Sequence, residues 1–587
     1  MEHVKTDIVI VGAGGAGLRA AIAIAQANPE IDVSLVSKVY PMRSHTCAAE
    51  GGAAGVKRAD DSLEMHFNDT VSGGDWLCDQ DVVDYFVQQA PLELIQLEHW
   101  GCPWSRDEDG SVAVRPFGGM KKKRTWYAAD KSGFHILHTL FQTSMQFPSI
   151  KRYDEFFCLD LVHENGRCTG VVALEMRSGK FFHFEAAAVI LATGGAGRIF
   201  PFTTNGAIKT GDGMAMAYRA GVALKDMEFV QYHPTGLPGT GILLTEGCRG
   251  EGGVLVNRHG YRYLQDYGMG PETPIGEPVL KTMELGPRDR LSQAFWHEQK
   301  KGNTVETQWG DCILMDMRHL GEKRINERLP LVRELATSYV GVDPVKDPVP
   351  VRPVVHYMMG GIDTNIDGET SMAGLYAIGE TACGSLNGAN RLGSNSLTEL
   401  LVFGKRAAQR AIEYIAADAD SQGGAGSRSQ AETAVKKVRE LLQRQTGDES
   451  LAGLRREMMN SLEEGAGIYR EAAGLEKTCR TLAELKGRFS NIVVHDKSNV
   501  FNTDLQQALE LQNMLDISET VSASALAREE SRGAHQRLDF PGRDDENCLR
   551  HSLCWRQEGE QPSMAWLDVN ITRSHPGVRD YSGETQA

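Results

Sequence analysis

Residues 7–17 read DIVIVGAGGAG, and this stretch decides the fold. Its apolar run at 7–11 predicts a buried strand of a parallel sheet, and residues 18–27 predict a helix after the glycines. Gly12 permits the tight turn, Gly14 lets the backbone approach a pyrophosphate, and Gly17 lets the helix pack closely on the strand. Because the first N–H groups of the helix then face the phosphates, the motif predicts a dinucleotide site, with a purely structural turn as the alternative.

The sequence after the second strand favours FAD over a nicotinamide cofactor. Residues 33–36 predict that strand, and Ser37-Lys38 stand where an NAD site would carry an acidic residue for the ribose. The glycine motif occurs once, so no second unit for a nicotinamide cofactor is predicted. Further strands at 187–192 and 375–378 lead into glycine-rich turns that add support, namely Thr193-Gly194-Gly195, Gly379-Glu380 and Gly211-Asp212-Gly213.

The strand signals occur early in the chain and again after residue 350, which predicts a flavin domain interrupted by an inserted one. Residues 417–430 are rich in Gly and Ser, which is typical of a linker, and apolar residues at helical spacing beyond it predict a helical bundle. We therefore expect an α/β fold in several parts. They are a Rossmann-like FAD-binding domain at 1–236 and 352–416, an inserted α+β capping domain at 237–351, a helical domain at 431–540 and a short C-terminal region at 541–587.

Charge and cysteine usage argue against several classes of protein. Lys plus Arg number 62 and Asp plus Glu number 78, and the net charge of −16 argues against a nucleic-acid partner. The 11 cysteines are scattered without a C-x-x-C pair, which indicates free thiols rather than disulfides, an iron–sulfur cluster or another metal site. The sequence has no signal-peptide pattern and no apolar run near the ~20 residues of a membrane helix. We expect a cytoplasmic chain whose membrane contact comes through partners.

Several motifs together resemble the flavoprotein subunits of fumarate reductases and succinate dehydrogenases. They are Arg43-Ser44-His45-Thr46, Ala49-Glu50-Gly51-Gly52, His233-Pro234-Thr235-Gly236, Pro287-Arg288-Asp289 and the runs 245–253, 356–361, 388–397 and 530–535. The motifs follow the family's order over nearly the whole chain. This combination is far more specific than any single motif.

The resemblance implies an FAD bound covalently through His45, a bond that raises the reduction potential of the flavin. On the residues alone, a plain loop histidine is the simpler interpretation of His45. The remaining cofactor site is predicted at Gly12, Ala13, Gly14, Gly15, Gly17, Ser37, Lys38, Ser44, Thr46, Glu50, Gly51, Gly52, Phe157, Asp212, Glu380, Arg391, Ser394, Asn395, Ser396 and Leu397.

The resemblance also implies a dicarboxylate site, because fumarate or succinate needs polar or charged donors at both ends. It places His233 and Thr245 at one end and His356 and Arg391 at the other, and Phe117 is also expected in the site. By the same resemblance Arg288 delivers a proton to the substrate carbanion, Glu246 and Arg249 relay protons from solvent, and His233 belongs to the catalytic group. On the residues alone, His233 is more simply a core histidine, and Arg288 is equally well a surface salt-bridge residue. Cys248 is expected to be a bystander.

Local sequence favours the reductase branch of the family. Met42, Glu50 and the strings 75–81 and 263–270 are similar to quinol–fumarate reductases. The predicted reaction is reduction of fumarate to succinate by hydride transfer. Succinate dehydrogenase is the alternative, followed by L-aspartate oxidase and a flavin-binding electron carrier without substrate. The family implies an iron–sulfur subunit, membrane anchor subunits and menaquinol or another quinone as partners, and a peripheral location on the cytoplasmic side of the inner (plasma) membrane.

Overall fold

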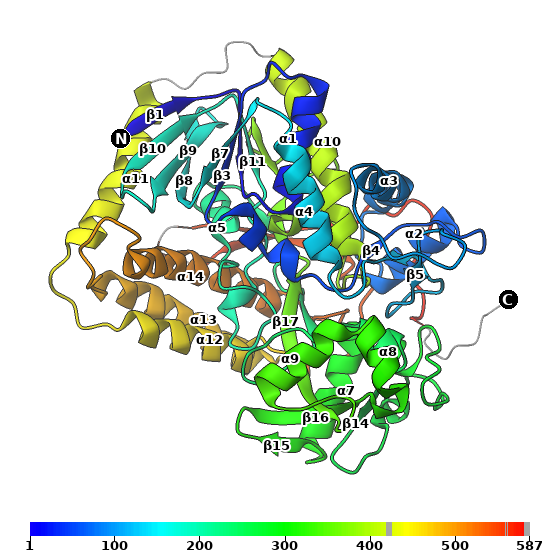
Figure 1. Ribbon diagram of the computed structural model, residues 1–587. Coiled ribbons are helices and arrows are strands. Elements are labelled where there is room, and N and C mark those ends of the chain that lie inside the picture. The colour runs from blue at the N-terminus through cyan, green and yellow to red at the C-terminus, as the bar shows by residue number, and fades with distance from the viewer. Residues whose placement is uncertain (418–424, 558, 560, 580–587) are drawn as a thin grey trace.

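The computed structural model describes residues 1–417, 425–557, 559 and 561–579. The four strands predicted for the flavin domain are confirmed as members of one parallel sheet with the order β19-β11-β2-β3-β7. Their bounds are Leu375–Ala377 (β19), Ala188–Leu191 (β11), Ile8–Val11 (β2) and Val33–Ser37 (β3). Helices α1 (Gly15–Ala27) and α10 (Asn395–Ala417) pack on each other beside this sheet (Figure 1). Because the strands are covered on both faces, all their residues are buried and nearly all are apolar, with Ser34 and Ser37 of β3 as the exceptions.

Two features of the flavin domain differ from the sequence expectation. Helix α1 begins at Gly15 rather than at residue 18, because the last two glycines of the motif already belong to its first turn. The edge strand β7 (Ile150–Asp154) carries Lys, Arg and Asp and lacks the apolar run that identifies its neighbours. A second sheet of β1 (Glu2–Lys5), β10 (Phe181–Glu185), β9 (Arg167–Glu175) and β8 (Phe156–Glu164) lies beside this one (Figure 1). Other helices of this part are α2 (Leu63–Gly73), α3 (Gln80–His99), α4 (Ser132–Ser144) and α5 (Asp212–Arg219).

The inserted region forms its own layer, which is green in Figure 1. Its sheet has the order β13-β17-β16-β14, with bounds Val230–Gly236, Val349–Met358, Gly310–Asp316 and Val254–Val256. Helices α6 (Gly247–Gly250), α7 (Arg288–Lys300), α8 (Gly321–Arg328) and α9 (Pro330–Val340) complete it. The boundary predicted after residue 236 falls at the end of β13, and the boundary predicted after residue 351 falls inside β17. These two strands connect the insertion to the flavin domain.

The predicted helical bundle consists of α11 (Ala425–Gln443), α12 (Leu451–Gly465), α13 (Ala472–Arg488) and α14 (Thr503–Ala527). The linker prediction at 417–430 is wrong for 425–430, which belong to α11, and for Ala417, which ends α10; residues 418–424 lie outside the described residues. In the C-terminal region, strands β21 (Arg550–Trp555) and β22 (Ser563–Asp568) join β12 (Leu224–Lys225) in a sheet. In the described part of the chain, no helix is long and apolar enough to cross a membrane.

Candidate active site

The glycine motif forms a cradle at the N-terminus of α1. Gly12 has φ +110°, and a Cβ on Gly17 would lie 1.8 Å from the carbonyl oxygen of Gly12, so both positions require glycine for the fold itself. A Cβ on Gly14 would meet nothing closer than Thr46 Oγ1 at 3.4 Å. Because the protein leaves room at Gly14, the demand for glycine there comes from a ligand that approaches the backbone. No acidic side chain lies in the first turn of α1, which keeps this end suited to a phosphate.

A cavity extends from this cradle along the carboxyl ends of the sheet. Its lining joins the phosphate cradle to His45 and Glu380, which lie far apart in the sequence, and this extended shape suits a dinucleotide. Of the predicted cofactor residues, those that line it are Gly12, Ala13, Gly14, Gly15, Ser37, Lys38, Ser44, His45, Thr46, Asp212, Glu380, Ser396 and Leu397. Those that do not line it are Gly17, Glu50, Gly51, Gly52, Phe157, Arg391, Ser394 and Asn395.

His45 lies in a single turn of 3₁₀ helix and faces the cavity. Its Nδ1 accepts a hydrogen bond from Gly206 N at 3.3 Å, and its Nε2 has no hydrogen-bond partner among the described residues. Burial, together with the charge of Lys209, holds the pKa of His45 well below its ordinary value. The imidazole is therefore neutral at physiological pH, which is the nucleophilic form.

Two ion-pair clusters contribute residues to the lining of the cavity. Lys38 Nζ lies 2.7 Å from Asp212 Oδ2 and 3.0 Å from Glu510 Oε1, so the lysine that replaces the expected acidic residue is itself neutralised by two carboxylates. Lys38 Nζ lies 5.5 Å from the centroid of the Phe157 ring. Phe157 itself does not line the cavity, whereas its neighbours Phe156 and Cys158 do. Lys209, which also lines the cavity, pairs with Glu380.

The predicted substrate residues converge beside this cavity, which His356 also lines. Arg288 and Arg391 both donate to the same side-chain oxygen, Gln231 Oε1, at 3.1 and 3.3 Å. Arg391 is 2% exposed and has no ion-pair partner among the described residues. Burial, with the charge of Arg288, lowers the pKa of Arg391 to about 10. An uncompensated cation in this position favours an anionic ligand.

The two predicted histidines lie next to each other with ring centroids 5.1 Å apart. His233 Nδ1 accepts from Thr235 N at 3.3 Å, and His356 Nδ1 lies 2.8 Å from Thr204 Oγ1. Burial and the neighbouring arginines hold the pKa of each histidine well below its ordinary value. Both rings are therefore neutral, and each can offer an N–H to a carboxylate without adding charge.

Glu246 connects Arg288 to Arg249. Its Oε2 lies 2.9 Å from Arg288 Nε and 3.5 Å from Arg249 Nη2, and its Oε1 accepts from the backbone N–H of Gly118. Burial raises the pKa of Glu246, but the charges of Arg249 and Arg288 outweigh that effect and lower it below the usual range. Thr245 precedes Glu246 and is fully buried, as is Phe117.

Several buried polar atoms around the cavity have no hydrogen-bond partner in the described part of the protein. They are Ser44 Oγ, Glu50 Oε2, His233 Nε2 and Arg391 Nε. Buried polar atoms are normally satisfied, so this cluster indicates ligands that complete the site. The phosphate cradle, the extended cavity and these atoms fit FAD beside an anionic substrate.

Sequence reasoning did not identify Gln231, Lys209 and Glu510. Gln231 lies on strand β13, two residues before His233, and a neutral amide belongs to none of the sequence motifs. Lys209 lies two residues before the predicted turn Gly211-Asp212-Gly213 and belongs to no motif. Glu510 on α14 is far from Lys38 in sequence. Only the folded chain brings these residues to the site.

The fold and the site together define an FAD-dependent oxidoreductase. The chain matches the model of an FAD binding domain at residues 7–397 and that of the fumarate reductase flavoprotein C-terminal domain at 455–581. It is 58% identical to the fumarate reductase flavoprotein subunit of Haemophilus influenzae, and the alignment covers 100% of this chain and 98% of that one. The chain therefore belongs to the fumarate reductase and succinate dehydrogenase flavoprotein family.

Two further comparisons place the chain within the family. A solved structure described as quinol-fumarate reductase with menaquinol molecules superposes with a TM-score of 0.96 at 58% identity, over 98% of this chain and 100% of that one. A succinate dehydrogenase flavoprotein subunit from Rickettsia bellii is 41% identical over 97% of this chain and 96% of that one. The chain is thus more similar to the reductase than to this dehydrogenase.

Proposed function

We propose that this chain is the flavoprotein subunit of a quinol–fumarate reductase and that it reduces fumarate to succinate beside the flavin cavity. The observation that carries the proposal is the buried guanidinium of Arg391, which makes no direct ion pair with a carboxylate among the described residues. A buried cation of this kind suits one of the two carboxylates that fumarate carries. The 58% identity to known fumarate reductase subunits supports the reductase direction.

The chain's own residues bind, orient and protonate the substrate. When bound, FAD supplies the hydride that reduces one alkene carbon. His233 and Thr245 hold one carboxylate, and His356 and Arg391 hold the other, where the arginine also stabilises the charge that develops during reduction. Phe117 closes the site with an apolar ring, and a Cβ on Gly51 would lie 2.7 Å from that ring, so Gly51 is required there.

Arg288 delivers the proton to the other alkene carbon. Its guanidinium lies between Gln231 and Glu246, which fixes its orientation in the substrate site. Glu246 Oε2 is in contact with both Arg288 and Arg249, so a proton that Arg288 gives up can be replaced through this carboxylate. This chain of contacts supports the assignment of Arg288 as the acid.

We assign the covalent attachment of FAD to His45, since its neutral ring faces the cavity. The partners are an iron–sulfur subunit that delivers electrons one at a time and membrane anchor subunits that react with menaquinol or another quinone. The similar structure that contains menaquinol molecules supports this assembly. In the proposed assembly this chain is a peripheral subunit on the cytoplasmic side of the inner membrane.

The test is anaerobic turnover of the purified chain with a viologen dye, comparing fumarate reduction with succinate oxidation in one preparation. Faster fumarate reduction is expected. Faster succinate oxidation would assign the chain to the dehydrogenase branch and keep the site. No turnover in either direction, with FAD bound, would contradict the proposal and favour an L-aspartate oxidase or a protein without this substrate.

A further inference from the structure

We propose that Arg579 is a positioning residue for the proton donor Arg288 and acts through Asp289. This inference rests on the proposed function, because it concerns the same proton-delivery step. Arg579 makes a two-pronged ion pair with Asp289, with Nη1 2.7 Å from Oδ2 and Nη2 3.3 Å from Oδ1. The two side chains are 10% and 1% exposed, so the pair is largely withdrawn from water. Paired geometry of this kind fixes orientation as well as distance.

Asp289 directly follows Arg288 in the first turn of α7. This helix begins at Arg288 with Pro287 as its N-cap, which provides no side-chain cap hydrogen bond. The two neighbouring side chains have separate partners, since Arg288 contacts Glu246 and Gln231 whereas Asp289 contacts Arg579. The orientation of the first turn of α7 about the helix axis therefore depends on the ion pair between Arg579 and Asp289. Movement of this turn would displace the Arg288 guanidinium from the substrate.

The charge balance leads to the same conclusion. Without Arg579, Asp289 would be a buried carboxylate with no ion pair to another described residue, and a buried charge without a partner is strongly unfavourable. Arg288 is a cation close enough in the chain to replace the lost partner. Its reorientation toward Asp289 would break its bond to Glu246 and thus its connection to Arg249.

The segment that carries Arg579 is fixed firmly to the flavin domain. Gln80 at the start of α3 accepts from the backbone N–H groups of Thr572, Arg573 and Ser574 at 3.1, 3.0 and 2.9 Å. Trp76 Nε1 donates to Ser574 Oγ at 3.1 Å. These bonds fix the backbone of the segment that carries Arg579, and the Arg579 side chain contacts Asp289 on α7.

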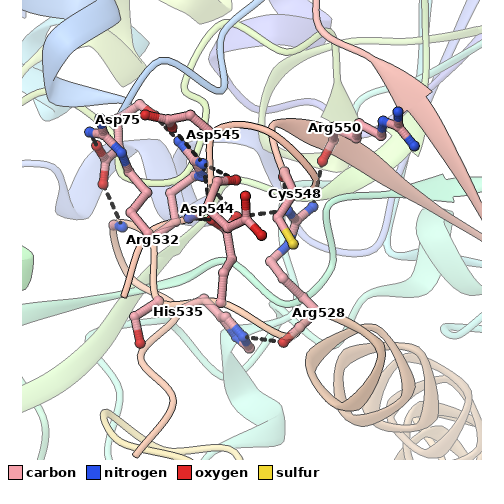
Figure 2. Close-up of polar contacts among 12 residues, drawn as sticks. Asp75, Arg528, Arg532, His535, Asp544, Asp545, Cys548 and Arg550 are labelled. Carbon is pink, nitrogen blue, oxygen red and sulfur yellow. Dashed lines mark hydrogen bonds and ion pairs between the residues drawn. The ribbon is translucent and has the colours of Figure 1, made fainter. Parts of the chain in front are cut away.

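Asp75 links this segment to a buried charge cluster. Arg579 Nη1 lies 3.6 Å from Asp75 Oδ2, and Arg543 Nη1 lies 2.8 Å from Asp75 Oδ1. Figure 2 shows Asp75 beside Arg532 and Asp545, and Arg532 donates to the Asp75 carbonyl and to the Asp545 carboxylate, each at 2.9 Å. The capping helix α7, the turn before α3 and the C-terminal segment thus meet at Arg579.

The test compares the full-length FAD-loaded chain with its Arg579→Gln, Arg579→Lys and Arg573→Gln variants in viologen-driven fumarate reduction. Arg573 is the matched control, because it lies on the same segment and pairs with Asp84 on α3 rather than with α7. We expect Arg579→Gln to lower kcat by about 10- to 100-fold with little change in KM, as small displacements of a catalytic group do. The solvent deuterium isotope effect on kcat should rise because proton delivery becomes limiting. Arg579→Lys should recover part of the rate, and Arg573→Gln should match the wild type.

A second variant keeps the test decisive if Arg579→Gln fails to retain FAD. Asp289→Asn removes the carboxylate that Arg579 neutralises, so it should also lower kcat, and adding Arg579→Gln should cause little further loss, as coupled residues do. Equal kcat values for Arg579→Gln and Arg573→Gln, or additive losses in the double variant, would overturn the inference. Absence of fumarate turnover in the wild-type chain would instead contradict the proposed function.

Discussion

Arg288 is the side chain on which the proposed chemistry depends most directly. We expect Arg288→Ala to lower fumarate reduction by about 10²- to 10⁴-fold, the range that a positioned general acid contributes. Dicarboxylate binding should largely persist, because Arg391, His233 and His356 keep their positions on other elements. Steady-state kinetics and perturbation of the flavin spectrum by fumarate separate the two effects. A substantial residual rate would remove Arg288 from the role of acid.

A second prediction about a single residue concerns the covalent attachment of FAD to His45, and its test does not depend on turnover. His45→Ser should retain FAD without the covalent bond, because the remaining cradle at α1 is unchanged. Flavin fluorescence should therefore disappear from the acid-denatured chain. His138→Ser is the control, since that histidine is exposed on α4. Fluorescence that persists in denatured His45→Ser would place the attachment elsewhere.

At the scale of elements, the glycines of the cradle have separable roles. A methyl group on Gly17 would lie 1.8 Å from the Gly12 carbonyl, so Gly17→Ala should destabilise the chain by about 1–3 kcal/mol or more, as overpacking does. Gly14→Ala should leave the unfolding temperature of the FAD-free chain unchanged and reduce its FAD content. Thermal melts measure the unfolding temperatures of the two variants, and the ratio of flavin to protein measures their FAD content. Equal destabilisation by the two variants would show that Gly14 is also a packing requirement.

Contact between the helical bundle and the capping sheet should depend on pH. Tyr232 on β13 donates to Glu463 Oε2 on α12 at 3.2 Å, and burial raises the pKa of Glu463 despite the charge of Arg352. A carboxyl whose folded pKa is raised contributes stability that is present below its unfolded pKa of about 4.3 and is lost as pH rises through the folded value.

Glu463→Gln keeps an acceptor for Tyr232 but cannot ionise. Its melting temperature relative to the wild type should therefore increase as the pH is raised from about 5 to 8. Glu464→Gln is the control, because that neighbouring side chain is 70% exposed. A melting-temperature difference that does not vary with pH would contradict the prediction.

The elements that the sequence predicted are those whose signal is local. The strands at 7–11, 33–36, 187–192 and 375–378 are mostly apolar because helices cover the sheet. Strand β7 has no such run because it lies at the sheet edge, and residues 425–430 are helical although their composition is typical of a linker. Arg288 and Arg391 were predicted through motifs, whereas Gln231 was not, since a bridging amide acquires its role only when these two arginines are brought to it.

At the scale of the whole molecule, polar contacts from the loop before α4 help to hold helices α8 and α9 of the capping region against the flavin domain. Asp130, in the loop before α4, accepts from Leu331 N at 2.8 Å and so caps α9 from the flavin domain. Arg328 donates to Tyr127 Oη at 3.2 Å nearby. Cys248, on the capping side of the site, is fully buried in this arrangement. Its rate of alkylation therefore reports how often the capping region opens.

Asp130→Ala removes the cap, which is worth about 1 kcal/mol, and should raise the population of open molecules about fivefold. Asp130→Asn is the matched control, because it removes the same negative charge near Cys248 but keeps an oxygen that accepts from Leu331 N. We expect N-ethylmaleimide to modify Cys248 about fivefold faster in Asp130→Ala than in Asp130→Asn, as measured by peptide mass spectrometry. Fumarate should slow both reactions by binding between the two regions. Equal rates in the two variants would show that this cap does not control closure, and that contacts such as the Arg579–Asp289 pair hold the capping region in place.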